Sequence, residues 1–287
     1  AAYFEQAFCH EEADMSFLSS LTSSTDRHKM AMEIRPFGVE EVEESMGWLR
    51  NRKCPGADGV WNEMVKLPAT GTRNYRNELA EVLCGLFNKI MASGVFPTAW
   101  KECIIIPAYK KGDTTCPENY RPICLLSSLS KLFTKLLNQR IAKAAEAGGV
   151  FTNTQGGGRR MRDIREKLSI IRGVIDHANR HDNQLYLLLT DISKAFDSVP
   201  HNAIRAAYEF FGFPQGVVEL VSNMVTDNHA RVLTTTLSRR FPMGKGTRQG
   251  DSLSPTTYVL VHQLVLLYVR DRMKGYSTGR RRLWNAA

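Results

Sequence analysis

The most constraining feature of this sequence is an apolar run that ends on an acid, in the stretch LYLLLTDISKAFDSVPH over residues 185–201. Six uncharged residues precede Asp191, and an apolar run of that length predicts a strand buried on both faces. A carboxylate at the end of a buried strand is costly unless a cation or hydrogen bonds compensate it. Asp191 therefore either holds a cation such as Mg²⁺ or caps the turn that follows, and the run by itself favours the cap.

Apolar periodicity predicts helices and strands on both sides of this run. The β-branched segment CIIIPAY at 103–109 predicts a strand, and alternation over 230–241 predicts a hairpin. Helical spacing predicts helices over 39–50, 75–93, 132–141, 162–180, 202–211 and 215–226, and a last helix starting near Ser254–Pro255 as N-cap and first helical residue. The mixture indicates an α+β or α/β fold.

The charge of the chain is unevenly distributed. Of 38 Lys and Arg and 29 Asp and Glu, residues 1–50 hold four bases and ten acids, so the rest carries 34 bases against 19 acids. A basic body suits a polyanionic partner such as nucleic acid, and equally a merely soluble basic protein. No apolar run approaches the ~18–20 residues needed to span a bilayer. The six scattered cysteines lack metal-ligand spacing, which favours reduced thiols in an intracellular protein.

A glycine-rich segment, GKGTRQGDSLSP over 244–255, lies just before the last predicted helix. Its backbone amides could approach a nucleotide closely, and the Gln249 side chain offers an amide for hydrogen bonding. A loop of this kind, taken alone, is more often just a turn.

Together the two segments resemble motifs A and B of reverse transcriptases. TDISKAFDSVPH and GTRQGDSLSP are similar to the non-LTR (LINE-type) retrotransposon branch, and KCPGADGV at 53–60, Phe96, Pro97, Trp100 and the segment at 104–141 match that branch in order and spacing. The resemblance covers roughly residues 37–275. It implies an α+β polymerase right-hand fold, with 1–36 as an acidic lead-in or linker, 37–183 as fingers and 184–287 as a partial palm without a thumb.

The resemblance implies an RNA-directed DNA polymerase that binds an RNA template, a DNA primer and dNTPs and uses two Mg²⁺ ions. It makes Asp191 the catalytic carboxylate and, with the Ile192 carbonyl, a metal ligand. Phe196 falls at the position that excludes a ribose 2′-hydroxyl. The expected dNTP contacts are Arg121, Lys110, Lys111, Ile192, Phe196, Gln249 and Gly250, and the expected nucleic-acid contacts are Arg159, Arg160 and Arg248.

Structural roles compete with several of these expectations. For Lys110 or Lys111, either of which would assist Arg121, a solvated charged loop is nearly as well supported, and for Phe196 a place in the core is the less favoured alternative. For Arg248 we slightly favour a salt bridge that holds the loop over a contact with substrate. Asp197 lies six residues after Asp191, and we expect it to pair with Lys194 or to cap a helix at Ser198 rather than bind metal.

The sequence departs from the family pattern twice. TQGGGRR at 154–160 lacks the aromatic residue that usually follows TQ, and the chain closes with YSTGRRRLWNAA where the family's Ala-Asp-Asp motif is expected. We therefore expect a polymerase fragment, cut before that motif and inactive alone. A degenerate or domesticated relic that binds nucleic acid without polymerase activity is the alternative, and an unrelated basic phosphotransfer enzyme is less favoured. In an active element we expect a nuclear location.

Overall fold

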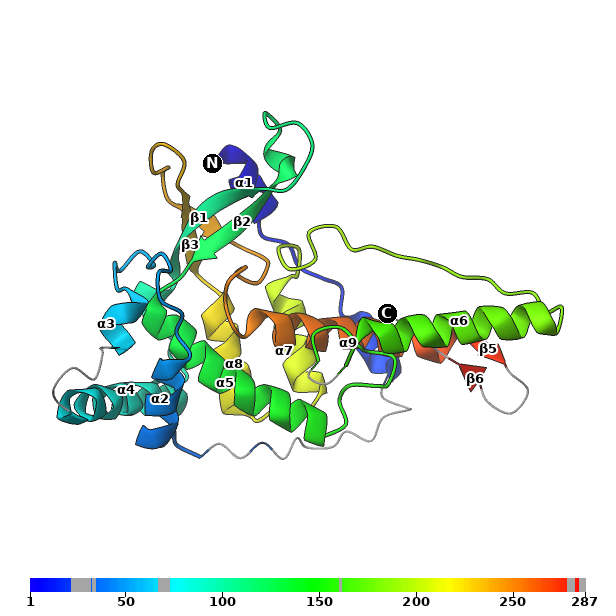
Figure 1. Cartoon of the computed structure of the whole chain (residues 1–287), viewed down its shortest axis with the longest axis horizontal. Helices are drawn as coiled ribbons and strands as arrows, with labels where there is room; N and C mark the ends of the chain where they lie inside the picture. The colour runs from blue at the N-terminus through cyan, green and yellow to red at the C-terminus, as the bar shows by residue number, and fades with distance from the viewer. Residues whose placement is uncertain (22–31, 33–34, 67–72, 160–161, 278–281, 284–287) are drawn as a thin grey trace.

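A four-stranded sheet of order β2-β1-β3-β4 forms one end of the molecule (Figure 1). The computed structural model describes residues 1–21, 32, 35–66, 73–159, 162–277 and 282–283. β1 pairs antiparallel with β2 and parallel with β3, where Glu102 lies opposite His229, and β3 pairs antiparallel with β4. The bounds of the strands are Glu102–Tyr109 for β1, Tyr120–Leu125 for β2, Asn228–Val232 for β3 and Phe241–Met243 for β4.

Helices pack around α5 to form the main hydrophobic core, which contains the fully buried Phe133, Leu136 and Tyr208. No helix in the described residues is long and apolar enough to cross a membrane. The longer helices of this body are α2 (Val39–Gly47), α4 (Arg73–Ser93), α5 (Ser128–Ala147), α7 (His201–Phe210), α8 (Gln215–Val225) and α9 (Ser254–Arg272). Short helical turns are α3 (Asn62–Lys66), η1 (Ser16–Leu21), η2 (Thr98–Trp100) and η3 (Pro117–Asn119).

The first helix, α1 (Ala2–Ala7), belongs to a second core beneath the sheet. Phe4 and Phe8 are 4% and 1% exposed and pack with the apolar residues of the strands. The acidic side chains that follow pair with bases of the body, Glu5 with Arg239 and Glu11 with Lys245. Within the expected lead-in or linker over 1–36, the described residues 1–21 form an arm that packs on the body, because two phenylalanines supply the apolar area that anchors it.

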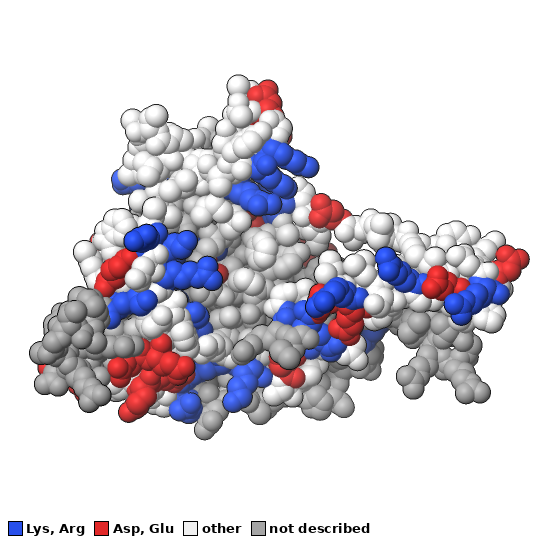
Figure 2. Space-filling model, in the orientation of Figure 1, with Lys and Arg blue, Asp and Glu red and all other residues white. Residues whose placement is uncertain are grey.

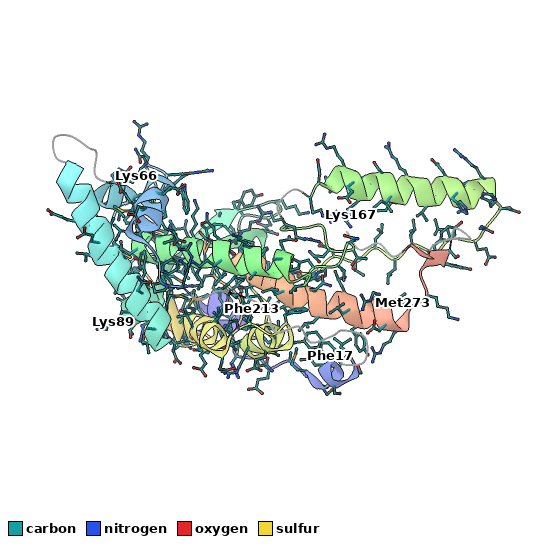
Figure 3. The ribbon with its side chains drawn as sticks, turned by 90° about the horizontal axis from the view of Figure 1, so that it is seen from below. Phe17, Lys66, Lys89, Lys167, Phe213 and Met273 are labelled. Carbon is teal, nitrogen blue, oxygen red and sulfur yellow. The ribbon has the colours of Figure 1, made fainter. Side chains whose placement is uncertain are left out.

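Helix α6 (Ile164–Arg180) projects away from the body (Figure 1), and the view from below shows it well separated from α9 (Figure 3). Beneath it lies a two-stranded ribbon of β5 (Tyr276–Ser277) and β6 (Arg282–Leu283). The Nδ1 atom of His177 lies 2.9 Å from the Tyr276 hydroxyl, which joins the helix to the ribbon. Ile164 and Leu168 are 70% and 52% exposed, so part of the apolar face of α6 is uncovered.

Most of the expected elements are confirmed, including the strand at β1, the hairpin of β3 and β4, and all seven helices. Gly94 has a φ of 66°, as expected of the glycine that ends α4. At the last helix, Ser254 lies inside α9 and forms no N-cap, because its hydroxyl donates to the Arg248 carbonyl instead.

The predicted buried strand at 185–191 is wrong. The segment is an extended connection between α6 and α7 that pairs with no strand in the described parts of the chain (Figure 1). Tyr186, Leu188 and Leu189 are 86%, 80% and 87% exposed. The apolar composition predicts a preference for burial, but a strand forms only where a neighbour supplies the other half of the hydrogen-bond ladder.

Candidate functional site

A cavity of about 190 Å³ lies where four parts of the chain meet: the β1–β2 hairpin, helix α1, the loop that carries residues 194–197 and the loop that carries Gln249. Its wall includes Lys110, Arg121, Phe196 and Gln249, four of the residues that the sequence assigned to a nucleotide. These residues come from three separate segments of the chain. Figure 2 shows Lys and Arg side chains gathered near the top of the molecule, just below the tip of the β1–β2 hairpin.

The β1–β2 hairpin sets the positions of the two cations. Arg121 lies opposite Ala108 in the ladder, and the Lys110 backbone N–H donates a 2.8 Å hydrogen bond to the Asn119 carbonyl beyond the last ladder pair. Arg121 is exposed, and no described carboxylate forms an ion pair with it or with Lys110. Two unpaired cations at one end of a cavity favour an anionic ligand.

Backbone hydrogen bonds join the 196–199 segment to the 244–251 loop. The Thr247 N–H donates to the Phe196 carbonyl, and the Gly246 N–H donates to the Val199 carbonyl, both at 2.7 Å. Gly246 has a φ of 87°, and a Cβ atom there would lie 2.7 Å from the Asp197 carbonyl oxygen. Only glycine permits this approach, so the two loops form one rigid unit.

The same loop is fastened to the sheet beside Arg121. The Cys124 N–H donates a 2.9 Å hydrogen bond to the Gln249 carbonyl, and a Cβ atom on Gly250 would lie 2.9 Å from the Cys124 carbonyl oxygen. Gly250 has a φ of 122°, which L side chains rarely adopt. Gly250 therefore acts through its lack of a side chain, which lets the loop bring Gln249 to the cavity.

Phe196, which lines the cavity, packs against an aromatic residue of α9 that lies behind it. Its ring lies 4.9 Å from that of Tyr258 at an angle of 38°, and Phe196 itself is 37% exposed. Burial raises the pKa of Tyr258, and the charge of Asp191 raises that pKa further. Asp191 therefore lies close enough to Tyr258 to interact electrostatically, on the side of the loop that carries Phe196.

Asp191 and Ile192 lie on the exposed segment, and Ile192 is 47% exposed. Within the described ranges, no group of three or more His, Cys, Asp or Glu side chains could hold a metal ion. A magnesium site needs several oxygen ligands in octahedral geometry. The described residues do not by themselves make such a site.

Asp197 faces the cavity and has an unusual environment. Its Oδ1 atom is buried without a hydrogen-bond partner, and burial raises the pKa of its carboxyl to about 6, against a smaller lowering by Lys194. The Asp197 carboxylate caps no helix, because α7 begins at His201 without a side-chain cap. Among the described residues Asp197 forms no ion pair with Lys194, whose charge only lowers the pKa of the carboxyl, so neither the expected pairing nor the expected cap is present.

Arg248 is a buried tether of the loop. Its guanidinium donates to Asp251 at 2.9 Å and to the Trp100 carbonyl at 2.8 Å, and the residue is 5% exposed. The salt bridge that the sequence slightly favoured is confirmed. A guanidinium that is 5% exposed and bonded to a carboxylate and a carbonyl of the protein is not accessible to a phosphate, so the expectation of a nucleic-acid contact for Arg248 is corrected.

Arg159 is also committed to the protein. It pairs with Glu146 and donates to the carbonyls of Thr152 and Gln155. These bonds correct the expectation that Arg159 contacts nucleic acid. Arg160, the other expected contact, lies outside the described residues. Lys111 is exposed next to the cavity but is not part of its wall.

The TQGGG segment packs closely without the aromatic residue usual in the family. A Cβ atom on Gly158, which has a φ of 70°, would lie 2.7 Å from a methyl group of Val259 in α9. Gln155 also contacts the ring of His262 in α9, with its Oε1 atom 3.1 Å from Nδ1. The glycines thus replace aromatic packing by direct approach of the backbone to α9.

Sequence reasoning gave no role at the site to the rest of the cavity wall, which comprises Tyr3, Phe4, Ala7, Phe8, Glu118, Tyr120, Pro122, Lys194 and Ala195. Lys194 lies in the motif TDISKAFDSVPH, and the sequence predicted only that it pairs with Asp197. Tyr3 lies in a segment with no motif, and its one sequence signal is the aromatic pair of Tyr3 and Phe4 at helical distance from Phe8.

Comparison with known proteins gives a consistent result. The family model described as reverse transcriptase (RNA-dependent DNA polymerase) matches residues 109–278. The chain is 28% identical over 262 residues to a protein named probable RNA-directed DNA polymerase from transposon BS of Drosophila melanogaster, covering 90% of this chain and 28% of the relative. It is 26% identical over 232 residues to the RNA-directed DNA polymerase from mobile element jockey of the same species, covering 80% and 24%.

A third relative comes from another insect. The chain is 28% identical over 225 residues to the retrovirus-related Pol polyprotein from type-1 retrotransposable element R2 of Popillia japonica, covering 77% of this chain and 29% of the relative. The chain thus spans less than a third of the length of these relatives.

Proposed function

The chain belongs to the reverse transcriptase family, with relatives among the RNA-directed DNA polymerases of non-LTR retrotransposons, and from this premise we propose that its cavity receives the incoming dNTP. One observation carries the proposal. Lys110, Arg121, Phe196 and Gln249 line a single cavity although they are far apart in the chain.

The cationic end of the cavity suits the triphosphate. The Arg121 guanidinium can form two parallel hydrogen bonds to phosphate oxygens, and the Lys110 ammonium adds a point charge beside it. Neither cation has a carboxylate partner that would have to be displaced, so phosphate binding costs little rearrangement of the protein. Lys111, on the exposed loop, can add a longer-range attraction.

The aromatic wall suits a deoxyribose. Phe196 stacks on Tyr258, and its backbone carbonyl is held by the Thr247 N–H, so the ring has little freedom to retreat from a larger sugar. A ribose 2′-hydroxyl would meet this ring, whereas a deoxyribose would not. Gln249, placed by Gly250 against the sheet, completes the pocket on the side of the base.

For the metal, we propose that Asp191 contributes one carboxylate and Ile192 its carbonyl to Mg²⁺. The ion, when bound, would supply neutralisation of charge on the phosphates and activation of the attacking hydroxyl. Further ligands would have to come from the substrate phosphates or from groups outside the described residues.

The mixed α/β architecture with its small sheet suits a division into fingers over 37–183 and part of a palm from 184 onward. RNA template and DNA primer would be the nucleic-acid partners of the whole protein, in a nuclear setting.

A binding measurement on the 287-residue chain tests the nucleotide pocket. Each of the four dNTPs should bind with similar affinity by titration calorimetry, and Arg121→Ala should weaken binding by about tenfold, the usual size of one charge-assisted interaction. Arg180→Ala, which removes an exposed arginine at the far end of α6, is the matched control and should change nothing. Absence of dNTP binding, or equal affinity in Arg121→Ala, would refute the assignment.

A further inference from the structure

Lys194 occupies the cavity wall in a backbone conformation that is rare for a residue with a side chain. Its φ is 51°, in the left-handed region. The conformation is set by a turn in which the Lys194 carbonyl accepts hydrogen bonds from the N–H groups of Asp197 at 2.8 Å and Ser198 at 3.0 Å. The turn therefore fixes the direction in which the lysine side chain leaves the backbone. A left-handed conformation at a residue with a side chain is strained, and it persists only where surrounding contacts such as these hydrogen bonds hold it.

The lysine ammonium rests on an aromatic ring from the N-terminal arm. The Lys194 Nζ atom lies 4.8 Å from the centre of the Tyr3 ring. The ring is firmly supported, because Tyr3 packs at its edge on Phe4, which is buried in the second core. A cation over an aromatic face is attracted to it without being neutralised.

Charge around the cavity is unbalanced. Lys110, Arg121 and Lys194 all line it, and none of the three lies within the 4.0 Å ion-pair distance of a carboxylate in the described residues. The acidic side chains of the wall are Glu118 and Asp197. Burial raises the pKa of Asp197 to about 6, which reduces the cost of protonating it when an anion approaches.

We propose that Lys194 is a third phosphate contact of the nucleotide pocket and that Tyr3 holds it in position until a polyphosphate binds. The inference rests on the proposed dNTP site and deepens it. Lys194 stands on the loop that carries Phe196 and Arg121 on the sheet, and both line the cavity, so the polyphosphate would be held by two separate segments of the chain. Helix α1 lies outside the segment that matches the family and becomes part of the substrate site through Tyr3.

Binding of inorganic tripolyphosphate to the 287-residue chain, followed by titration calorimetry, tests this role directly. Lys194→Gly should raise the dissociation constant by about tenfold, as expected for loss of one charge-assisted contact. The same change should raise the melting temperature, because glycine adopts the left-handed backbone without strain. Weaker binding in a more stable protein separates loss of a contact from loss of folding.

Two further variants sharpen the test. Tyr3→Leu keeps the apolar packing and removes the cation–π contact, so it should raise the dissociation constant about threefold, the effect of a weak exposed interaction. Lys89→Met is the matched control, since it removes an exposed lysine of α4 that is not part of the cavity wall, and it should leave tripolyphosphate binding unchanged.

The outcomes separate the role of Lys194 from the proposed dNTP site on which it rests. If wild type binds tripolyphosphate and Arg121→Ala weakens binding while Lys194→Gly does not, the role of Lys194 is wrong and the nucleotide site stands. If wild type binds no tripolyphosphate and no dNTP, both are wrong. A single-stranded oligonucleotide whose binding weakens in Lys194→Gly, with tripolyphosphate unaffected, would place Lys194 on the nucleic-acid path and overturn the inference.

Discussion

The Thr247 backbone N–H donates a hydrogen bond of 2.7 Å to the Phe196 carbonyl, and the Thr247 hydroxyl donates to the same oxygen at 3.3 Å. Two donors on one acceptor fix the peptide that carries the aromatic wall of the cavity. The geometry of the pocket therefore depends on the contact between two loops, and several measurements can test that dependence.

Gly246→Ala should destabilise the protein by about 2–4 kcal/mol, through strain at positive φ together with a clash against the Asp197 carbonyl. Gly85→Ala is the control, because Gly85 lies inside α4 with nothing near its missing Cβ, and this change should stabilise by about 0.5–1 kcal/mol. Urea denaturation of the two variants checks both signs. Equal effects would mean that the loops are not held as described.

Removing one partner of the buried pair Arg248–Asp251 should be costly. Arg248→Met leaves the Asp251 carboxylate buried without its cation, and the expected loss is about 3–5 kcal/mol in the free energy of unfolding. The double variant Arg248→Met with Asp251→Leu should recover part of this loss. A double-mutant cycle in guanidinium chloride measures the coupling, and additive effects would contradict the pairing.

Asp197 should make stability depend on pH between about 4 and 6. Burial raises its pKa from 3.8 to about 6, so the folded state binds the proton more tightly than the unfolded state does. Its contribution is therefore greatest at low pH and is lost as the pH rises through this window, by at most about 3 kcal/mol. Asp197→Asn should remove the dependence and be more stable than wild type at pH 7.

The control for the pH effect lies in the same neighbourhood. Burial lowers the pKa of His201, so its effect on stability has the opposite sign and is lost as the pH falls. The difference between wild type and Asp197→Asn cancels this contribution, because both proteins keep His201. A difference curve that is flat from pH 4 to 6 would show that the Asp197 carboxyl is solvated.

Phe196→Val should reduce discrimination between dTTP and its ribose counterpart by about tenfold in binding, because the smaller side chain no longer fills the space of the 2′-hydroxyl. Phe196→Tyr keeps the ring and should retain the selectivity of wild type. Competition titrations with the two triphosphates measure the ratio, and an unchanged ratio in Phe196→Val would place the sugar elsewhere.

The exposed apolar run should contribute little to the stability of this chain. Leu188→Gln should change the free energy of unfolding by less than about 0.5 kcal/mol, because the side chain is 80% exposed. Leu136→Ala, in the fully buried core, should cost about 2–5 kcal/mol by comparison. Amide exchange adds a second readout: residues 186–191 should exchange rapidly and Ala230 in β3 slowly.

Local pattern predicted the helices and the hairpin strands because their hydrogen bonds are close in sequence. The stripe in α4 and the glycine at 94 are enough to give that helix and its end. The same reasoning failed at 185–191, where burial depends on a neighbouring strand and not on the composition of the run. The resemblance added what pattern could not, namely that Lys110, Arg121, Phe196 and Gln249 belong to one site.

The parts of the site that sequence reasoning missed depend on tertiary contacts. The pairing of Arg159 with Glu146 follows from burial, which no local pattern reveals for a charged residue, whereas the Arg248 salt bridge within one loop was the favoured expectation. The role of α1 was missed for a related reason. Its acidic surroundings suggested a solvated linker, whereas two phenylalanines decide where it packs.

The parallel pairing of Glu102 in β1 with His229 in β3 has a consequence for synthesis of the protein on the ribosome. β1 emerges long before β3, so its edge must wait unpaired while the helices between them are translated. Helix α1 waits longer still, because Phe4 and Phe8 pack against Phe241 and Met243 of β4. Helix α1, which is translated before all four strands of the sheet, is thus among the last of these elements to pack, and a nascent chain stalled before β3 would expose both an open strand edge and an unanchored aromatic arm to chaperones.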